Sequence, residues 1–122
     1  MAPHDPIAIA VDWLDAYSNV SIDQLVAMYS RDAIIECGCG NRTCISGVDC
    51  ISHYLIHQTV EYPALGLHDI WMEGDSVGLA YRTENGFVRA FLDIAGNGLV
   101  TRCRCGPVAK RPCRNVEISG GR

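Results

Sequence analysis

The chain has 122 residues, which is the length of one domain of ordinary size. Hydrophobic residues make up 48% and charged residues 20%, a balance typical of a soluble globular protein and unlike that of a disordered one. The formal net charge is −4, and an acidic surface is a poor partner for a phosphate backbone, so we expect no nucleic-acid binding. No apolar run approaches the ~20 residues of a membrane-spanning helix, and the N-terminus lacks the basic residues of a signal peptide. We therefore expect a cytoplasmic protein that makes no membrane contact.

The first half of the chain predicts three helices and one strand. An aspartate followed by a proline is a good start for a helix over residues 6–17, where apolar residues recur at helical spacing. A serine and a glutamine at capping-box spacing begin a second, shorter helix over residues 22–29. The sequence AIIEC, residues 33–37, is typical of a strand. A third helix follows over residues 48–62, and it ends there because the next residue, a proline, disfavours helical geometry before it.

The second half predicts four strands joined by tight turns. The segments LGLHDIWME, SVGLAYRTE, FVRAFLDIA and LVTRCRC have the length of strands and are rich in β-branched or aromatic residues. GD, NG and GNG lie between them, and Asn-Gly favours the type I′ turn of a hairpin. Helices followed by an antiparallel meander indicate an α+β domain whose sheet curls over the helices.

This order of elements resembles the nuclear transport factor 2-like superfamily, in particular its ketosteroid isomerase-like and SnoaL-like polyketide cyclase branch. The resemblance is carried by the segments LVAMYSRDAIIEC, ISG followed by ISHY, and LDIAGNGLV. It implies one domain over residues 1–107, a cystatin-like cone whose N-terminal helices pack in a strongly curved antiparallel sheet around an apolar pocket. Residues 108–122 are expected to form a flexible C-terminal tail.

The resemblance also implies which residues stand at the catalytic positions of ketosteroid isomerases. The tyrosine acid, the aspartate base and the second carboxylic acid of those enzymes fall here on Trp13, Cys37 and Ala90, whereas a supporting tyrosine is matched by Tyr54. None of the first three can act in the same way, because an indole only donates and the other two lack a carboxyl group. We therefore expect a pocket without steroid-isomerase chemistry. The residues expected to line it are Trp13, Tyr17, Cys37, Tyr54, Val88, Ala90, Cys103 and Cys105.

Five of the seven cysteines lie in two clusters that the resemblance brings together. Strand alternation turns Cys37, Cys39, Cys103 and Cys105 toward the pocket, since the first strand lies beside the last in this fold. One interpretation is that they are reduced thiols that pack as small apolar residues. Others are a disulfide, either between the clusters or between Cys39 and Cys44, and a zinc site. The Cys-x-Cys spacing suits zinc poorly, so no metal or other cofactor is expected.

A nucleophilic Cys37 is the enzymatic interpretation of the same residues. A thiolate needs a base or a cation nearby, and here Glu36 is adjacent while His53 or His57 is expected to face the pocket from the third helix. The chain would then be an isomerase, cyclase or hydrolase of unusual residue set. The main expectation is binding of a small apolar or aromatic molecule, and a third possibility is a non-catalytic dimerisation or interaction module.

The outer face of the sheet is expected to carry the polar residues of the meander strands. Phe87 and Phe91 share a side with Arg89 and would give that face the apolar centre of a homodimer interface, which this superfamily often forms. Trp71 is expected in the pocket lining together with the first tryptophan. The polar residues placed on the outer face are Arg82, Glu84, Arg89 and Asp93.

Overall fold

The computed structural model describes residues 5–38 and 43–106. Its elements follow the predicted order, with one additional strand near the middle of the chain. None of the helices in these two ranges is long and apolar enough to span a membrane. The predicted tail over residues 108–122 lies outside the described residues. The elements are α1 (Pro6–Ser18), α2 (Ile22–Ala27), β1 (Tyr29–Cys37), β2 (Thr43–Ser46), α3 (Val48–Glu61), β3 (Gly66–Glu73), β4 (Ser76–Thr83), β5 (Gly86–Ile94) and β6 (Val100–Cys105).

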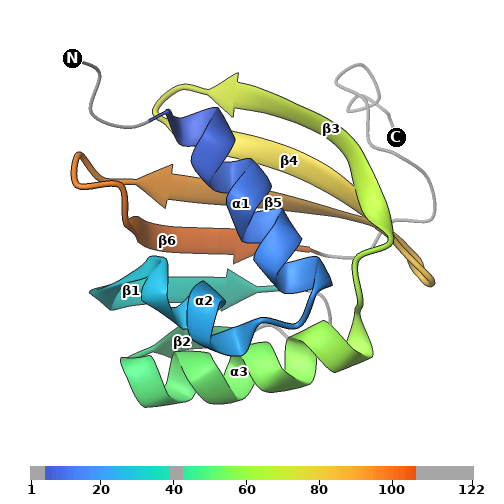
Figure 1. The fold of residues 1–122 in the computed structure, drawn as a ribbon, viewed down its shortest axis with the longest axis horizontal. Helices are drawn as coiled ribbons and strands as arrows, with labels where there is room; N and C mark the ends of the chain where they lie inside the picture. Colours follow the sequence, from blue (N-terminus) through green and yellow to red (C-terminus); the bar gives the residue numbers. More distant parts are fainter. Residues whose placement is uncertain (1–4, 39–42, 107–122) are drawn as a thin grey trace.

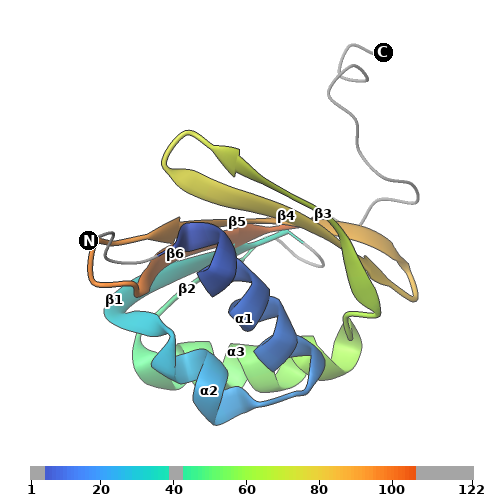
Figure 2. The same cartoon turned by 45° about the horizontal axis from the view of Figure 1, so that its top comes forward.

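The strands form a single sheet in the order β2-β1-β6-β5-β4-β3. The four meander strands β3 to β6 pair antiparallel as predicted. The pair β1–β6 is parallel, so the sheet is mixed where the sequence predicted a purely antiparallel one. The sheet curves over the three helices, with α1 crossing its concave side and α3 lying beneath β1 and β2 (Figures 1 and 2). The molecule is therefore the expected α+β cone.

The structure adds β2 and lengthens β1 relative to the prediction. β2 is only four residues long, too short for a clear alternation pattern, and it is held as a strand by its antiparallel pairing with β1. β1 begins at Tyr29, where the sequence predicted the last residue of a helix. Tyr29 is 7% exposed and belongs to the core, so tertiary packing overrides its helical spacing.

The starts of the first two helices differ in how they are capped. The Asp5 carboxylate accepts a hydrogen bond from the Ile7 N–H at 3.1 Å, as predicted for α1. The capping box predicted for α2 does not form, because the Ser21 N–H donates instead to the Ala16 carbonyl at 2.9 Å. This N–H is therefore not available to the Gln24 side chain, which would accept from it in a capping box.

The core lies between the helices and the concave face of the sheet. Its members alternate along the strands, since successive side chains of a strand point to opposite faces. On β1, for example, Ala33, Ile35 and Cys37 are all at most 6% exposed. The fully buried side chains that fill the centre are Tyr17, Leu25, Ile51, Leu55, Val77, Leu79, Tyr81, Val88, Leu92 and Val100.

Candidate functional site

Three neighbouring strands form the inner wall on which the candidate site is built. Cys37 on β1 lies opposite Cys105 on β6, and Cys105 in turn lies opposite Ala90 on β5. One step along the strands, Cys103 lies between Ile35 and a leucine of β5 in the same way. Cys37, Cys103 and Cys105 therefore share the inner face, which confirms the predicted alternation and the pairing of the first strand with the last. Cys39, the fourth thiol of the predicted wall, lies outside the described residues.

Tyr54 of α3 closes over the end of this wall. Its hydroxyl lies 3.5 Å from the Cys105 sulfur and also makes a hydrogen-bond contact with Cys37. Burial raises the pKa of the Tyr54 hydroxyl, and the sulfurs of Cys105 and Cys37 raise it further. The phenol is therefore neutral at physiological pH and can donate one hydrogen bond.

Cys37, Cys105 and Cys103 form a row of thiols, and Tyr29 lies at the Cys103 end of this row. It is buried beside Cys103, and the indole Nε1–H of Trp13 donates to its hydroxyl at 3.0 Å. Burial is the main cause that raises the pKa of Tyr29, and the Cys103 sulfur adds to it. A hydrogen bond with Cys105 and burial likewise raise the pKa of the Cys103 thiol. The row of sulfurs, with a protonated Cys103, thus lies between two neutral phenols.

An aromatic cluster fills the interior beside the thiols. Trp13 and Tyr17 of α1 stack with ring centroids 5.5 Å apart, and Tyr81 of β4 lies 5.6 Å from Tyr17. The Tyr17 hydroxyl is within hydrogen-bond distance of the carbonyl oxygens of Gln58 and Tyr62, at 3.0 and 2.8 Å. This contact holds the end of α1 against the end of α3, so the aromatic rings are fixed in place.

Gln58 is a candidate residue that the sequence analysis did not single out. It lies one turn after Tyr54 on the same face of α3, and its side chain is 8% exposed. Among the described residues, no group accepts a hydrogen bond from its Nε2. The signal in the sequence is a polar residue at a position where the apolar stripe of the helix predicts a buried one.

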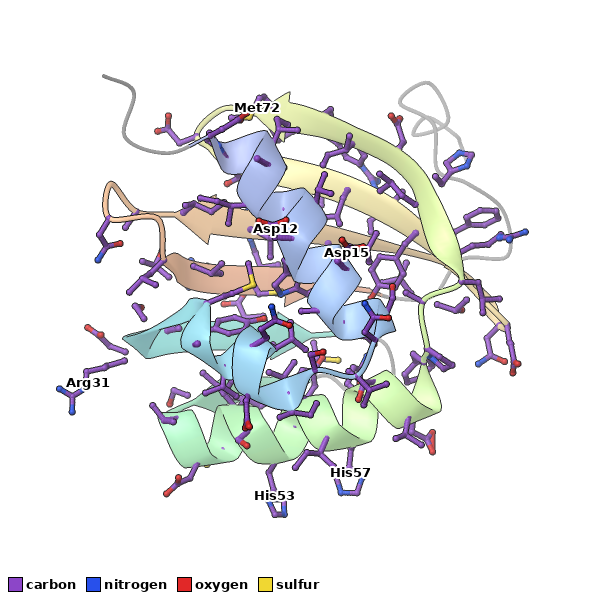
Figure 3. All side chains as sticks on the ribbon, viewed as in Figure 1. Asp12, Asp15, Arg31, His53, His57 and Met72 are labelled. Carbon is purple, nitrogen blue, oxygen red and sulfur yellow. The ribbon has the colours of Figure 1, made fainter. Side chains whose placement is uncertain are left out.

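The two histidines proposed as a base for a nucleophilic Cys37 do not face the interior. His53 and His57 are exposed and point away from the body of the protein, with ring centroids 6.1 Å apart (Figure 3). They do so because Ile51, Leu55 and the buried residues after them turn the opposite face of α3 inward. The expectation that one histidine faces the pocket is therefore wrong.

Glu36 is the other predicted partner, and it lies on the outer face of the sheet. Its carboxylate pairs with the Arg102 guanidinium at 3.2 Å, as strand alternation requires for the residue before an inward Cys37. Neither Glu36 nor the two histidines of α3 are thus placed to act as a base for Cys37. That Cys37 itself is a catalytic residue remains an untested prediction.

The same wall also bears on the other interpretations of the cysteines, namely a zinc site, a disulfide and reduced thiols. In residues 5–38 and 43–106, no set of three or more histidines, cysteines and acidic residues is arranged to hold a metal ion. The described cysteines are all present as thiols. The arrangement therefore presents reduced sulfurs beside two phenols on an otherwise apolar wall.

The outer face carries a second cluster, which we call the outer cluster and define as Trp71, Arg89, Phe91 and Arg104. Trp71 and Phe91 meet edge to face at 5.9 Å, and the Arg89 guanidinium lies 5.7 Å and 5.5 Å from the two rings. The Arg104 guanidinium lies 5.4 Å from Phe91. The expectation that Trp71 lines the pocket is wrong, because its row across the sheet, through Gly78 to Phe91, is on the convex side.

The predicted pocket residues are gathered on the inner side of the fold, but a cavity among them remains a prediction. Trp13, Tyr17 and Cys37 are at most 6% exposed, and the side chains of Val88 and Ala90 are fully buried. A hollow of about 220 Å³ lies elsewhere, between α1 and β3. None of the eight predicted residues lines it; its lining residues are Ala10, Val11, Leu14, Asp15, Ser18, Ala64, Leu65, Gly66, Leu67, Ile70 and Leu79.

Solved structures share this fold at low sequence identity. A SnoaL-like protein of unknown function from Burkholderia thailandensis matches with a TM-score of 0.72 and 13% identity, over 85% of this chain and 95% of that one. A Kribbella flavida protein provisionally called a ketosteroid isomerase matches with a TM-score of 0.68 and 21% identity, over 96% and 88% of the two chains. A Sinorhizobium meliloti protein provisionally called a polyketide cyclase matches with a TM-score of 0.70 and 18% identity, over 81% and 94%.

No protein-family model matches the sequence, and neither does any curated protein. The identities to the solved structures are low enough that the likeness concerns the fold alone. The chain thus has the ketosteroid isomerase-like, SnoaL-like fold predicted from its sequence, and its function has to be argued from its own residues.

Proposed function

We propose that this protein binds a small apolar or aromatic molecule that carries one hydrogen-bond acceptor, such as a ketone. The binding space would be the interior between α3 and the inner wall of β1, β6 and β5. The observation that carries the proposal is the buried amide of Gln58, whose Nε2 has no acceptor among the described residues.

Free-energy considerations favour a ligand at this amide. Leaving a buried donor without an acceptor costs about 1–3 kcal/mol, so native proteins rarely do so without a reason. A carbonyl oxygen of a bound molecule would recover that cost. The rest of the molecule would meet the rings of Trp13 and Tyr17 and the small side chain of Ala90, which suit an apolar or aromatic body.

The proposed activity is binding without steroid-isomerase chemistry. The indole N–H at the position of the tyrosine acid, on Trp13, is already donated to Tyr29. Cys37 and Ala90, which the resemblance assigns to the positions of the two carboxyl groups, flank Cys105 on neighbouring strands. A proton transfer of the kind those carboxyl groups perform has no equivalent donor or base at these positions.

The test compares two molecules that differ only in the acceptor, 1-tetralone and tetralin, by isothermal titration calorimetry. The wild-type protein should bind the ketone about tenfold more tightly, since one buried hydrogen bond is worth about 1.4 kcal/mol. Gln58→Leu, which keeps the side-chain volume, should bind both compounds equally. The matched control is Gln24→Leu on the exposed side of α2, which should keep the preference.

Two results would count against the proposal in different ways. Failure of both compounds to bind at millimolar concentration would exclude an apolar pocket of this kind. Equal binding of both compounds to the wild-type protein would keep the pocket and remove Gln58 from it. A thermal melt of Gln58→Leu, expected at or above that of the wild type, checks that the variant is folded.

A second candidate function is dimerisation through the convex face, which the outer cluster favours. Half-buried aromatic rings stacked with arginines are typical of the centre of protein interfaces. Phe87 extends this surface, with its ring 5.2 Å from that of His68. We expect a homodimer in sedimentation velocity at micromolar concentration. Phe87→Asp should make it monomeric, whereas Ile56→Asp, on the exposed side of α3, should leave the dimer intact.

A further inference from the structure

The ends of β1 and β6 bring two thiols to the same level of the sheet. Cys37 and Cys105 are register partners in the parallel pair, and the Gly38 N–H donates to the Cys105 carbonyl at 2.8 Å. Neighbouring strands lie about 4.8 Å apart, and a disulfide spans Cα atoms about 4.4–6.8 Å apart. Both sulfurs also contact the hydroxyl of Tyr54. The backbone is therefore already placed for a bond between these two sulfurs.

The same geometry disfavours the other pairings within the thiol row. Cys103 and Cys105 are alternate residues of one strand, so their Cβ atoms point the same way about 6.6 Å apart, whereas a disulfide needs about 3.8 Å. Cys37 is not opposite Cys103, whose register partner on β1 is Ile35. Among the cysteines of the described strands β1 and β6, Cys37 and Cys105 are the pair that faces directly across.

The two members of this pair differ in access to solvent. Cys105 is half-buried, whereas Cys37 is only 6% exposed and Cys103 only 2%. Of these three thiols, Cys105 is therefore the one that a reagent from solution meets first. The raised pKa of Cys103 keeps that thiol protonated, which makes it a poor competitor because the thiolate is the nucleophile.

We propose that Cys37 and Cys105 form a reversible redox pair that low-molecular-weight disulfides, such as oxidised glutathione, convert to an intramolecular disulfide. The Cys105 thiol loses its proton and its sulfur attacks one sulfur of the glutathione disulfide, so that one glutathione leaves as a thiolate. The Cys37 thiolate then attacks the Cys105 sulfur and displaces the second glutathione. Two protein thiols are oxidised to one disulfide, one glutathione disulfide is reduced to two thiols, and the two protons go to these products.

Tryptic mapping tests this assignment on the unmodified chain, because arginines divide the key cysteines among separate peptides. Cleavage after Arg102 and Arg104 separates Cys103 from Cys105, and cleavage after Arg31 and Arg42 releases residues 32–42. The protein is equilibrated with reduced and oxidised glutathione, quenched in acid, alkylated with N-ethylmaleimide and digested. We expect residues 32–42 joined to residues 105–110, with Cys39 alkylated. Apart from the mass of that one N-ethylmaleimide, the linked species should be about 2 Da lighter than the sum of the two reduced peptides.

Variants assign the bond within the peptide that covers residues 32–42, which also holds Cys39. Cys39→Ser should leave the cross-link unchanged. Cys37→Ala should remove it and trap Cys105 as a mixed disulfide with glutathione, because its register partner on β1 then carries no thiol. The link should also raise the midpoint of thermal unfolding of the wild type by several degrees, since it closes a long loop.

Three results would overturn the proposal. One is a cross-link between residues 103–104 and 105–110, and another is a cross-link that survives Cys37→Ala and is lost in Cys39→Ser. The third is a wild-type protein whose residues 32–42 stay fully alkylated in oxidised glutathione. None of these measurements involves a pocket ligand, so they stand apart from the binding test.

Discussion

The two faces of β6 have opposite chemistry, although both are built from alternate residues of one strand. Cys103 and Cys105 face inward among phenols and apolar side chains. Arg102 and Arg104 face outward and pair with carboxylates at 3.2 and 3.6 Å. On the inner face a charge would be costly to create, whereas on the outer face charges are solvated and worth little. Perturbations of the inner face should therefore have the larger effects.

The largest effect should come from alkaline pH, at which the groups of the inner face ionise once the protein unfolds. The pKa values of Cys103, Tyr29 and Tyr54 are raised in the folded protein, so unfolding releases protons above the ordinary pKa of each group. Stability is then fully present below about pH 8.5 and is lost as the pH rises further, by about 1.4 kcal/mol per pH unit for each group once its unfolded form is ionised. Urea unfolding followed by circular dichroism between pH 8 and 11 should show this loss.

Single variants show which face of the sheet causes the loss of stability at alkaline pH. Tyr29→Phe should reduce the slope above pH 10 by about 1.4 kcal/mol per pH unit, because one titrating group is gone. Asp93→Asn on the outer face should leave the slope unchanged, since a carboxylate does not titrate in this range. A slope that Tyr29→Phe leaves intact would mean that the Tyr29 hydroxyl is not the group held neutral.

An intermediate effect is expected where the outer face is tightly packed. A Cβ atom on Gly78 would lie 2.4 Å from Cε2 of Trp71, so Gly78→Ala has to displace the indole from the outer cluster. Overpacking of this kind costs about 1–3 kcal/mol in the free energy of unfolding, which chemical denaturation measures. Gly66→Ala is the matched control, because a Cβ atom there would meet nothing within 4 Å, and it should be nearly neutral. Equal losses in the two variants would refute the close approach of Trp71.

The smallest effect should come from the charged pair on the outer face. Glu36→Gln removes the ion pair with Arg102, whose side chain is 45% exposed. We expect a loss below about 0.5 kcal/mol in the free energy of unfolding, and less still in 0.5 M salt, because exposed charges are screened. A loss of several kcal/mol would contradict this expectation, because it would show that the charges of the outer face contribute strongly to the free energy of unfolding.

The sequence predicted those parts of the fold that rest on local signals. Turn residues located the four meander strands, and helical spacing located α1 and α3. Strand alternation placed Cys37, Cys103 and Cys105 on one face. β2 escaped prediction because four residues show too little alternation, and its position depends on pairing with β1. Tyr29 escaped because helical spacing and tertiary packing disagree at that residue.

The site was less predictable than the fold because it depends on how each helix or strand is rotated about its axis and on what surrounds single side chains. One residue of difference in helix phase decides whether a histidine or its neighbour faces inward, and α3 turns His53 and His57 out. Trp71 was assigned to the wrong face for the related reason that strand phase cannot be read from an aromatic residue alone. Whether Gln58 Nε2 has an acceptor depends on which groups surround it in three dimensions, and no sequence pattern predicts those groups.

The parallel pairing of β1 with β6 has a consequence for how the protein folds. β1 covers Tyr29–Cys37 and β6 covers Val100–Cys105, so their contacts join the first strand of the described chain to its last strand. Contacts of such long sequence separation form late, because the entropy of closing the intervening loop is lost before they stabilise the structure. During synthesis on the ribosome, β1 would keep one strand edge unpaired until β6 emerged. The wall that carries the thiols would thus be completed in the final step of folding.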